Sequence, residues 1–196
     1  MIYKIITALI FFSLTAVPQN KDTLYYLTAE LGAGYSRYIT TLDFPNLNQN
    51  GFSGTARVMW HPEHLLSVGL ETGYQYLYSI EADVTVPGYG TSKASASMYS
   101  IPVLMIFSMR IFPIVLPEFE LKFSSGIFLL YNSGTAFGSE IQSSQASIGY
   151  TIAATYLVPL NDMISYGGEL KYNYISKIQD ADLSIQAIFS YKCLHW

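Results

Sequence analysis

The stretch MISYGGELKYNYI at Met163–Ile175 alternates apolar and polar residues, and ADLSIQAIFSYK at Ala181–Lys192 repeats the pattern. In the first stretch Leu170 falls on the apolar face and Lys171 on the polar face, while in the second only Ile188 breaks the alternation. A period of two is typical of a β-strand with one apolar and one polar face. The apolar face points inward in a soluble sandwich but outward to lipid in a small transmembrane barrel. The rest of the chain decides between these folds.

The composition favours the membrane barrel. Hydrophobic residues make up 51% of the 196 residues and charged residues only 12%, about half the share usual in soluble domains. The chain has 17 Tyr and 11 Phe, yet no apolar run reaches the roughly 18 residues that a membrane-spanning helix needs. The apolar residues must therefore be spread over many short segments. The net charge of −4 offers no basic footprint for nucleic acid.

The N-terminus has the features of a secretory signal. Lys4 supplies the positive charge, Ile5–Phe12 is apolar, and Ala16 is a small residue at a candidate cleavage site. We expect a signal peptide over residues 1–18, cut between 16 and 20, followed by a single domain over residues 19–196. A buried N-terminal strand or helix is the alternative. The single cysteine, Cys193, allows no disulfide within one chain.

Six further stretches alternate in the same way, most weakly in Lys93–Met109, which predicts eight strands of about 10 to 16 residues. They are Leu24–Ile39, Phe52–His61, Leu66–Tyr78, Lys93–Met109, Phe119–Tyr131 and Ser147–Val158. Short turns of about four residues alternate with longer segments that we interpret as external loops, as in outer-membrane barrels. These loops are Thr40–Asn50, Ser79–Ser92 and Asn132–Ala146. The turn Arg110–Glu118 is longer and more apolar than the other turns. Near Pro102 we expect a bulge or an unpaired interior-facing position, because proline lacks the ladder donor.

Aromatic residues gather at the strand ends, as girdles at both membrane interfaces would require. At the expected external rim they are Tyr35, Tyr38, Tyr74, Tyr76, Tyr78, Tyr131, Tyr172 and Tyr174; at the other rim they are Tyr25, Trp60, Phe119, Tyr156, Phe189 and Tyr191. Mid-strand charges lie on the polar face, and Arg37 is an outlier near the rim. The sequence therefore predicts an all-β, transmembrane, eight-stranded antiparallel up-and-down β-barrel with both termini on the periplasmic side.

The signal, the eight strands, Ile101-Pro102-Val103-Leu104 and Leu170-Lys171-Tyr172-Asn173-Tyr174 resemble a known family. This is the bacterial outer-membrane β-barrel domain family, the OmpX/OmpW-like "porin family" common in Bacteroidetes-type bacteria. The resemblance covers about Thr23 to Lys192. It implies an integral protein of a Gram-negative outer membrane, monomeric, with outer-membrane lipid, lipopolysaccharide and the barrel-assembly machinery as partners. The external ligand is left open.

Barrels of this family usually end on an aromatic residue that serves as the assembly signal. Phe189 and Tyr191 fit that spacing, but the chain continues to Trp196. Either Trp196 is the signal in a shifted register, or the residues after Lys192 are a short tail.

The polar-face charges form the first candidate constellation: Glu30, Arg57, Glu71, Glu120, Lys122, Glu169 and Lys171. An eight-stranded barrel has an interior just wide enough for side chains to fill, and buried charges must pair. We therefore expect a salt-bridged plug that closes the lumen, with a narrow polar path as the alternative.

The histidines form the second candidate. His61 and His64 flank Pro62 in a turn and His195 is near the C-terminus, which we interpret as surface positions at one rim rather than a metal site. We predict no catalytic residue, no metal and no cofactor. The predicted function is a non-enzymatic structural or surface-interaction barrel. The first alternative is a small OmpW-like transport barrel with a lateral opening near Met98–Phe107; a lipid A-modifying enzyme ranks third.

Overall fold

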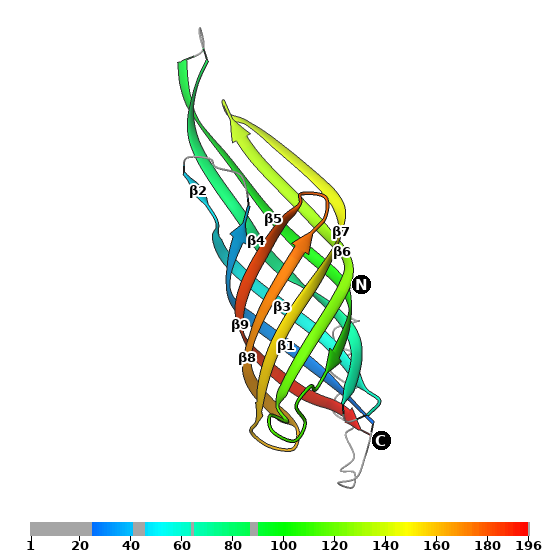
Figure 1. The fold of residues 1–196 in the computed structure, drawn as a ribbon. Coiled ribbons are helices and arrows are strands. Elements are labelled where there is room, and N and C mark those ends of the chain that lie inside the picture. The colour runs from blue at the N-terminus through cyan, green and yellow to red at the C-terminus, as the bar shows by residue number, and fades with distance from the viewer. Residues whose placement is uncertain (1–24, 41–45, 64, 87–89, 196) are drawn as a thin grey trace, which may run out of the picture.

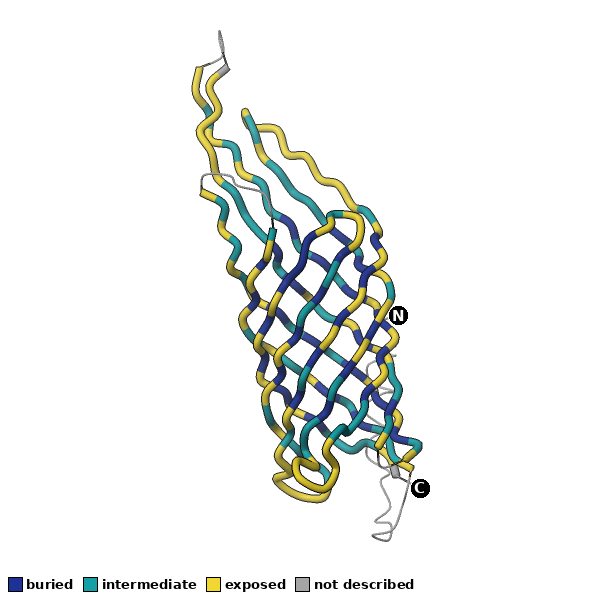
Figure 2. Tube along the Cα trace, in the orientation of Figure 1, coloured by how far each residue is buried: buried dark blue, intermediate teal, exposed yellow. Residues whose placement is uncertain are grey.

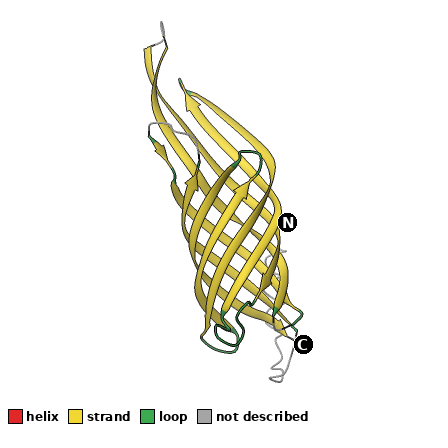
Figure 3. Cartoon of the chain, viewed as in Figure 1, coloured by secondary structure: helices red, strands yellow, loops and turns green. Residues whose placement is uncertain are grey.

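The computed structural model describes residues 25–40, 46–63, 65–86 and 90–195, and the regular structure in these ranges is β-strand throughout (Figure 3). The strands are β1 (Tyr26–Ile39), β2 (Leu47–Asn48), β3 (Asn50–His61), β4 (Leu66–Val86), β5 (Gly90–Met109), β6 (Phe119–Ala136), β7 (Ser139–Pro159), β8 (Ile164–Ile175) and β9 (Asp180–His195). The described residues include no helix of the length and apolar character needed to cross a membrane. The predicted signal peptide lies outside the described residues.

Eight of these strands close into a ring (Figure 1). Each ring strand pairs antiparallel with its neighbours in sequence, the β1–β9 pairing joins the two ends, and the short β2 lies outside the ring against β4. The predicted eight-stranded up-and-down barrel is confirmed. One rim of the barrel carries the β3–β4, β5–β6 and β7–β8 turns, and we call it the rim with the short turns. Both described ends of the chain lie at this rim, because Tyr26 pairs with His61 and with His195.

The predicted alternation sets the two faces of the wall (Figure 2). Leu31, Leu70 and Ile185 are exposed on the outside, whereas Glu30 and Glu71 are buried inside. The outlier Ile188 also faces inward, where both of its cross-strand partners are glycines, Gly32 and Gly167. A Cβ at Gly32 would lie 2.4 Å from Cδ1 of Ile188, so the missing side chain leaves the space that the isoleucine fills.

The loops expected at Ser79–Ser92 and Asn132–Ala146 are wrong. They form the ends of two long hairpins, β4–β5 and β6–β7, that project beyond the barrel (Figure 1). Paired hydroxyl groups join the strands, with oxygen–oxygen distances of 2.8 Å for Ser95–Thr135 and 2.9 Å for Ser97–Ser133. Hydrogen bonds between Ser and Thr on neighbouring strands stabilise a β-ladder. The loop prediction failed because a Ser-rich composition is also typical of loops. We call the projecting parts of these two hairpins the extension. It comprises residues 79–97 of the β4–β5 hairpin and residues 132–146 of the β6–β7 hairpin.

Proline at position 102 interrupts a ladder as expected. Pro102 is buried and pairs with Phe128 of β6, but the β4–β5 ladder records no partner for Ile101 or Pro102 while keeping the same register on both sides. The register shift lies further along β4, between Tyr76 and Tyr78. Pro102 therefore occupies an interior-facing position that is unpaired on its β4 side, and the bulge belongs to the neighbouring strand.

Two tyrosines of the predicted external girdle face the interior instead: Tyr38, which shares the inward face of β1 with Glu30, and Tyr78, which follows the bulge in β4. Tyr38 is buried inside the barrel, and Tyr78 lies against it with ring centroids 5.5 Å apart, so neither belongs to the outer aromatic belt. Together with other inward side chains they form an apolar cluster inside the barrel. Its buried members are Tyr38, Leu77, Met98, Leu104, Phe128, Leu130 and Ile175. The alternation is weak in β5 because that strand carries apolar residues on both faces.

The C-terminal segment is also not the expected tail. β9 continues through His195, and a register shift near Leu27 leaves Cys193 as the extra residue between Lys192 and Leu194. A tail after Lys192 is therefore wrong for residues 193–195. Trp196 lies outside the described residues.

Candidate functional site: the filled lumen and the extension

Arg57 occupies the centre of the lumen. It projects inward from β3, and its side chain is fully buried. Its guanidinium lies 3.2 Å from Glu30 on β1, 2.5 Å from Glu71 on β4 and 2.5 Å from Glu169 on β8. A second contact of 2.6 Å to Glu169 makes that pair bidentate, the geometry that suits arginine. One cation thus joins three strands of the wall across the barrel interior.

Two lysines complete the charge balance around these carboxylates. Lys122 Nζ on β6 lies 2.8 Å from Glu30, and Lys171 Nζ on β8 lies 2.8 Å from Glu71. Lys171 also donates to Thr55 at 2.8 Å. Arg57 and the two lysines therefore face three glutamates, and these six side chains are buried. We call these six residues the lumen network.

Glu120 belongs to a different group at the rim with the short turns. It lies 4.0 Å from Lys122 but accepts hydrogen bonds from Arg110 at 3.2 Å and Ser108 at 3.0 Å. Arg110 also donates to the hydroxyl of Tyr26 at 3.4 Å. Arg110 was not among the predicted lumen charges, because it is the first residue after β5, in the segment Arg110–Glu118 that was expected to be a turn.

His61 lies in the same rim group, and its expected surface position is wrong. It is the last residue of β3, is buried, contacts Thr28 at 3.0 Å, and stacks on Tyr26 with centroids 4.2 Å apart. Lys192 Nζ lies 5.0 Å from the centroid of the same tyrosine ring. His64 and the side chain of His195 lie outside the described residues. Among the described residues no group of His, Cys, Asp and Glu could hold a metal ion.

Asp182 is a buried carboxylate that the candidate set missed. It accepts hydrogen bonds from the amides of Gln75 and Asn173, and none of the ion pairs among the described residues includes it. Thr151 donates to Asn173 at 2.7 Å, which extends this polar layer to β7. The alternation had placed Asp182 on the polar face of its strand, so an inventory of every inward charge would have found it.

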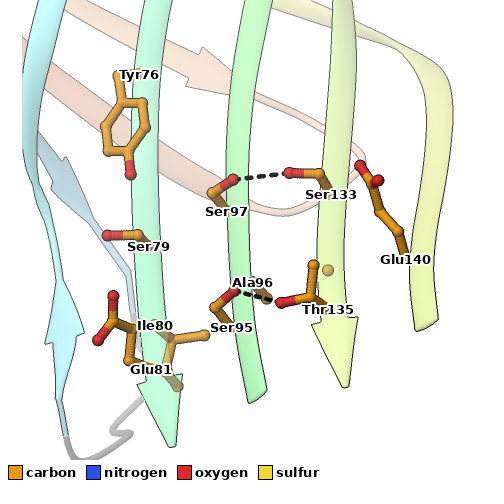
Figure 4. Close-up of a pocket in the computed structure, with 11 residues that line it drawn as sticks. Tyr76, Ser79, Ile80, Glu81, Ser95, Ala96, Ser97, Ser133, Thr135 and Glu140 are labelled. Carbon is orange, nitrogen blue, oxygen red and sulfur yellow. Dashed lines mark hydrogen bonds between the residues drawn. The ribbon is translucent and has the colours of Figure 1, made fainter. Parts of the chain in front are cut away.

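The outward face of the extension carries a shallow hollow of about 300 Å³ (Figure 4). It is lined by Tyr76, Ser79, Ile80, Glu81, Ser95, Ala96, Ser97, Ser133, Gly134, Thr135 and Glu140. On the barrel side of this hollow the rings of Tyr74, Tyr99 and Tyr131 stack in a row, with centroid separations of 5.3 and 5.0 Å. The face is therefore aromatic at the barrel rim and rich in hydroxyl groups beyond it.

β7 leaves one edge of the extension open. Its ladder with β8 begins at Gly149, and over Ser139–Ala146 the described strands provide no partner on that side. Contacts on the β8 side of β7 begin at Ser147, whose hydroxyl accepts a hydrogen bond from the backbone N–H of Lys177. Unpaired N–H and C=O groups along an edge are a template for pairing with another chain.

The comparisons with known proteins agree with the fold. Neither a protein-family model nor a curated protein sequence matches the chain. Among solved structures, a major outer membrane protein from Thermus thermophilus aligns with a TM-score of 0.53 and 17% identity, over 86% of this chain and 98% of the other. Ail, the attachment invasion locus protein of Yersinia pestis, in complex with the heparin analogue sucrose octasulfate, aligns with a TM-score of 0.52 and 14% identity, over 85% and 98%.

Neisserial surface protein A aligns with a TM-score of 0.51 and 13% identity, over 85% of this chain and 96% of the other. At these identities the comparison establishes fold alone. The chain has the fold of the small integral β-barrels of Gram-negative outer membranes, and its exposed apolar belt fits that location. The resemblance inferred from the sequence is confirmed at that level.

Proposed function

We propose that this protein is a closed, non-enzymatic outer-membrane barrel that displays the extension as an interaction surface outside the cell. The observation that carries the proposal is the filled lumen: the lumen network around Arg57 and the apolar cluster around Phe128 occupy the space where a pore would run. In an eight-stranded barrel the interior is only wide enough for such side chains. The barrel then acts as a rigid base for the two long hairpins.

The chemistry of the extension indicates the kind of partner. Its described residues carry Glu81, Asp83 and Glu140 but only one cation, Lys93. The polyanionic sucrose octasulfate bound by Ail would be repelled by such a surface. A neutral or basic extended peptide suits the open edge of β7, because an added strand pairs through main-chain hydrogen bonds.

The alternative function is transport through a lateral opening near Met98–Phe107. The continuous pairing of this segment with β6, from Met98↔Asn132 to Phe107↔Phe123, argues against a standing opening. The missing β4 partners at Ile101 and Pro102 are the feature that favours it. An opening there would require the two ladders beside β5 to separate.

An enzyme is the third candidate. The hydroxyl of Thr28 and the imidazole of His61 lie 3.0 Å apart, which is the spacing of a nucleophile–base pair. Both side chains are buried, and Tyr26 stacks on the imidazole, so a lipid substrate has no direct approach to them. This arrangement supports a structural role for His61.

Single-channel recording of the purified protein in a planar lipid bilayer tests the closed lumen. We expect no stable conductance from the wild-type protein, with a known porin as the control for the membrane. The double variant Arg57→Gly/Glu169→Gly removes one charge of each sign and creates a gap, so we expect conductance steps from it. Steady steps from the wild-type protein would favour transport and refute the closed lumen.

Display of the extension is tested on intact cells. Ser144→Cys should react with a membrane-impermeant maleimide, whereas the wild-type protein, with Cys193 near the opposite rim, should not. Asp162→Cys, in a short turn, is the matched control and should also stay unlabelled. Labelling of Asp162→Cys but not of Ser144→Cys would show that the barrel has the opposite orientation.

A further inference from the structure

The turn between β5 and β6 is unusually apolar for a segment at the rim of a barrel. Residues 111–117 read IFPIVLP and contain neither a charge nor a hydrogen-bonding side chain. The side chains are nonetheless open to the surroundings: Ile114 is 94% exposed and Val115 77% exposed, and Phe112 and Leu116 are exposed beside them. We call Ile111–Pro117 the apolar turn.

The apolar turn is held against the outside of the barrel. Phe112 packs on Phe119, with ring centroids 6.4 Å apart, and Phe119 pairs with the exposed Tyr156 on the outward face of β7. At the start of the turn Arg110 instead reaches inward to Glu120. The charged base of the turn thus points toward the lumen, while Phe112 packs against the outward side of the wall.

The backbone of the turn is suited to an apolar surrounding. The N–H of Leu116 donates to Phe112 at 2.8 Å and that of Phe119 to Leu116 at 3.1 Å. Pro113 and Pro117 have no N–H to satisfy. An unpaired backbone donor is costly in lipid, so these features lower the cost of immersing the turn.

We propose that the apolar turn inserts into the periplasmic leaflet of the outer membrane and anchors that rim of the barrel to phospholipid. The adjacent Phe119 and Tyr156 stand at the strand ends where the aromatic girdle marks the membrane interface. A protein-binding surface normally has a polar rim around its apolar centre, which the segment between Arg110 and Glu118 lacks. A phospholipid surface needs no such rim. The anchor goes beyond the proposed function, since it depends on the membrane barrel and not on the closed lumen.

Site-directed spin labelling in phospholipid vesicles tests the anchor. In a Cys193→Ser background, Ile114→Cys is labelled and its accessibility to oxygen and to a water-soluble nickel chelate is measured, with the chelate on both sides of the bilayer. Met105→Cys on the lipid-facing wall and Asp162→Cys in the polar β7–β8 turn are the matched controls. We expect the oxygen-to-nickel accessibility ratio at position 114 to lie near that of position 105 and several-fold above that of position 162.

A ratio at position 114 equal to that at position 162 would refute the anchor, because the turn would then lie in water. A periplasmic protein would then be the partner of the turn. Protection that grows with protein concentration would also overturn it, because a second copy would then cover the turn. If the Cys193→Ser background does not fold, Ile114→Trp gives the same information. The signal is the tryptophan emission of this variant minus that of the wild-type protein. Lipids brominated near the headgroup should quench it, and aqueous iodide should not. The reverse pattern would refute the proposal.

Discussion

At the scale of single residues, Arg57 determines how the barrel interior is held. Three glutamates from three strands converge on one guanidinium whose side chain is fully buried. Taking charges out of water is costly, and their mutual attraction offsets that cost only when the geometry is good and the remaining donors are satisfied. Here every nitrogen of the guanidinium contacts a carboxylate, so the buried cation meets this condition.

Arg57→Met should destabilise the folded barrel by about 3–5 kcal/mol, because it leaves buried carboxylates with too few cations. Arg110→Met should cost less, about 1 kcal/mol or below, because that side chain is 31% exposed and water screens its ion pair with Glu120. Urea unfolding in vesicles, followed by tryptophan fluorescence, measures both.

The double variant Arg57→Met/Glu169→Gln is the control for this charge argument. It leaves two lysines facing Glu30 and Glu71, so it should recover part of the stability that Arg57→Met loses. Equal losses for the single and double variants would show that packing rather than charge balance makes Arg57 important.

Leu170→Arg should also destabilise the barrel, for a different reason. Leu170 is exposed in the middle of the outward face of β8, where a charge costs about 2–4 kcal/mol in lipid. Tyr166→Arg, on the same face but nearer the short-turn rim, should cost about 0–1 kcal/mol for the charge. The folded fraction, read from the gel shift between unheated and heated samples, compares them. A larger loss for Tyr166→Arg would contradict the assigned membrane position.

At the scale of elements, small residues allow neighbouring strands to approach closely. A Cβ at Gly34 in β1 would lie 1.9 Å from the backbone oxygen of Ile185 in β9, a contact that a side-chain rotation cannot relieve. A Cβ at Gly54 in β3 would meet nothing closer than 3.4 Å, from the ring of Phe52. A side chain at Gly34 would force β9 to move, whereas a methyl group at Gly54 fits the existing space.

Gly34→Ala should therefore destabilise the barrel, by about 1–3 kcal/mol or more, because the β1–β9 seam must move apart. Gly54→Ala should be neutral or stabilising by a few tenths of a kcal/mol, since alanine restricts the unfolded chain. Unfolding midpoints in urea give the comparison. Equal effects would mean that β1 can shift freely against β9.

The extension is an element that we expect the barrel not to need for its stability. Its β4 and β5 segments pair with each other, with β2 and with β6, and they contribute no residue to the lumen network. Trimming Glu81–Ser95 and joining Ile80 to Ala96 with Asn-Gly should leave the unfolding midpoint of the barrel unchanged within about 0.5 kcal/mol. Failure of the trimmed protein to fold would show that the hairpin guides barrel closure.

At the scale of the whole molecule, β9 closes the ring against β1. The last described rungs, Leu27↔Leu194 and Tyr26↔His195, follow the register shift at Cys193. We propose that Phe189 and Tyr191, on the outward face of β9 before this shift, form the assembly signal. The final residues then add pairing but not recognition.

Truncation after Lys192 should accordingly leave a chain that still reaches the outer membrane, with a lower unfolding midpoint from the lost rungs. Phe189→Ala should accumulate in the periplasm. Fractionation of cells expressing each variant measures this. If the truncated chain stays in the periplasm while Phe189→Ala reaches the membrane, Trp196 is the signal instead.

The sequence by itself determined which residues face outward and which face inward, because alternation is a property of each strand that needs no partner. It could predict a barrel from the low charge content and could select all six members of the lumen network. It failed where the local signal was ambiguous: serine-rich strands resembled loops, and a bulge near Leu77 reversed the expected side of Tyr78.

Only the tertiary structure decided which inward residues meet. Arg57 and Glu169 are 112 residues apart and come together because ring closure brings β3 and β8 across the lumen from each other. The same closure places Asp182 beside Gln75, which is 107 residues away in the chain. Pairing between adjacent strands brings Glu120 within 3.2 Å of Arg110 and buries His61 against Thr28. Strand tilt and register set these contacts, and no periodicity within a single strand encodes them.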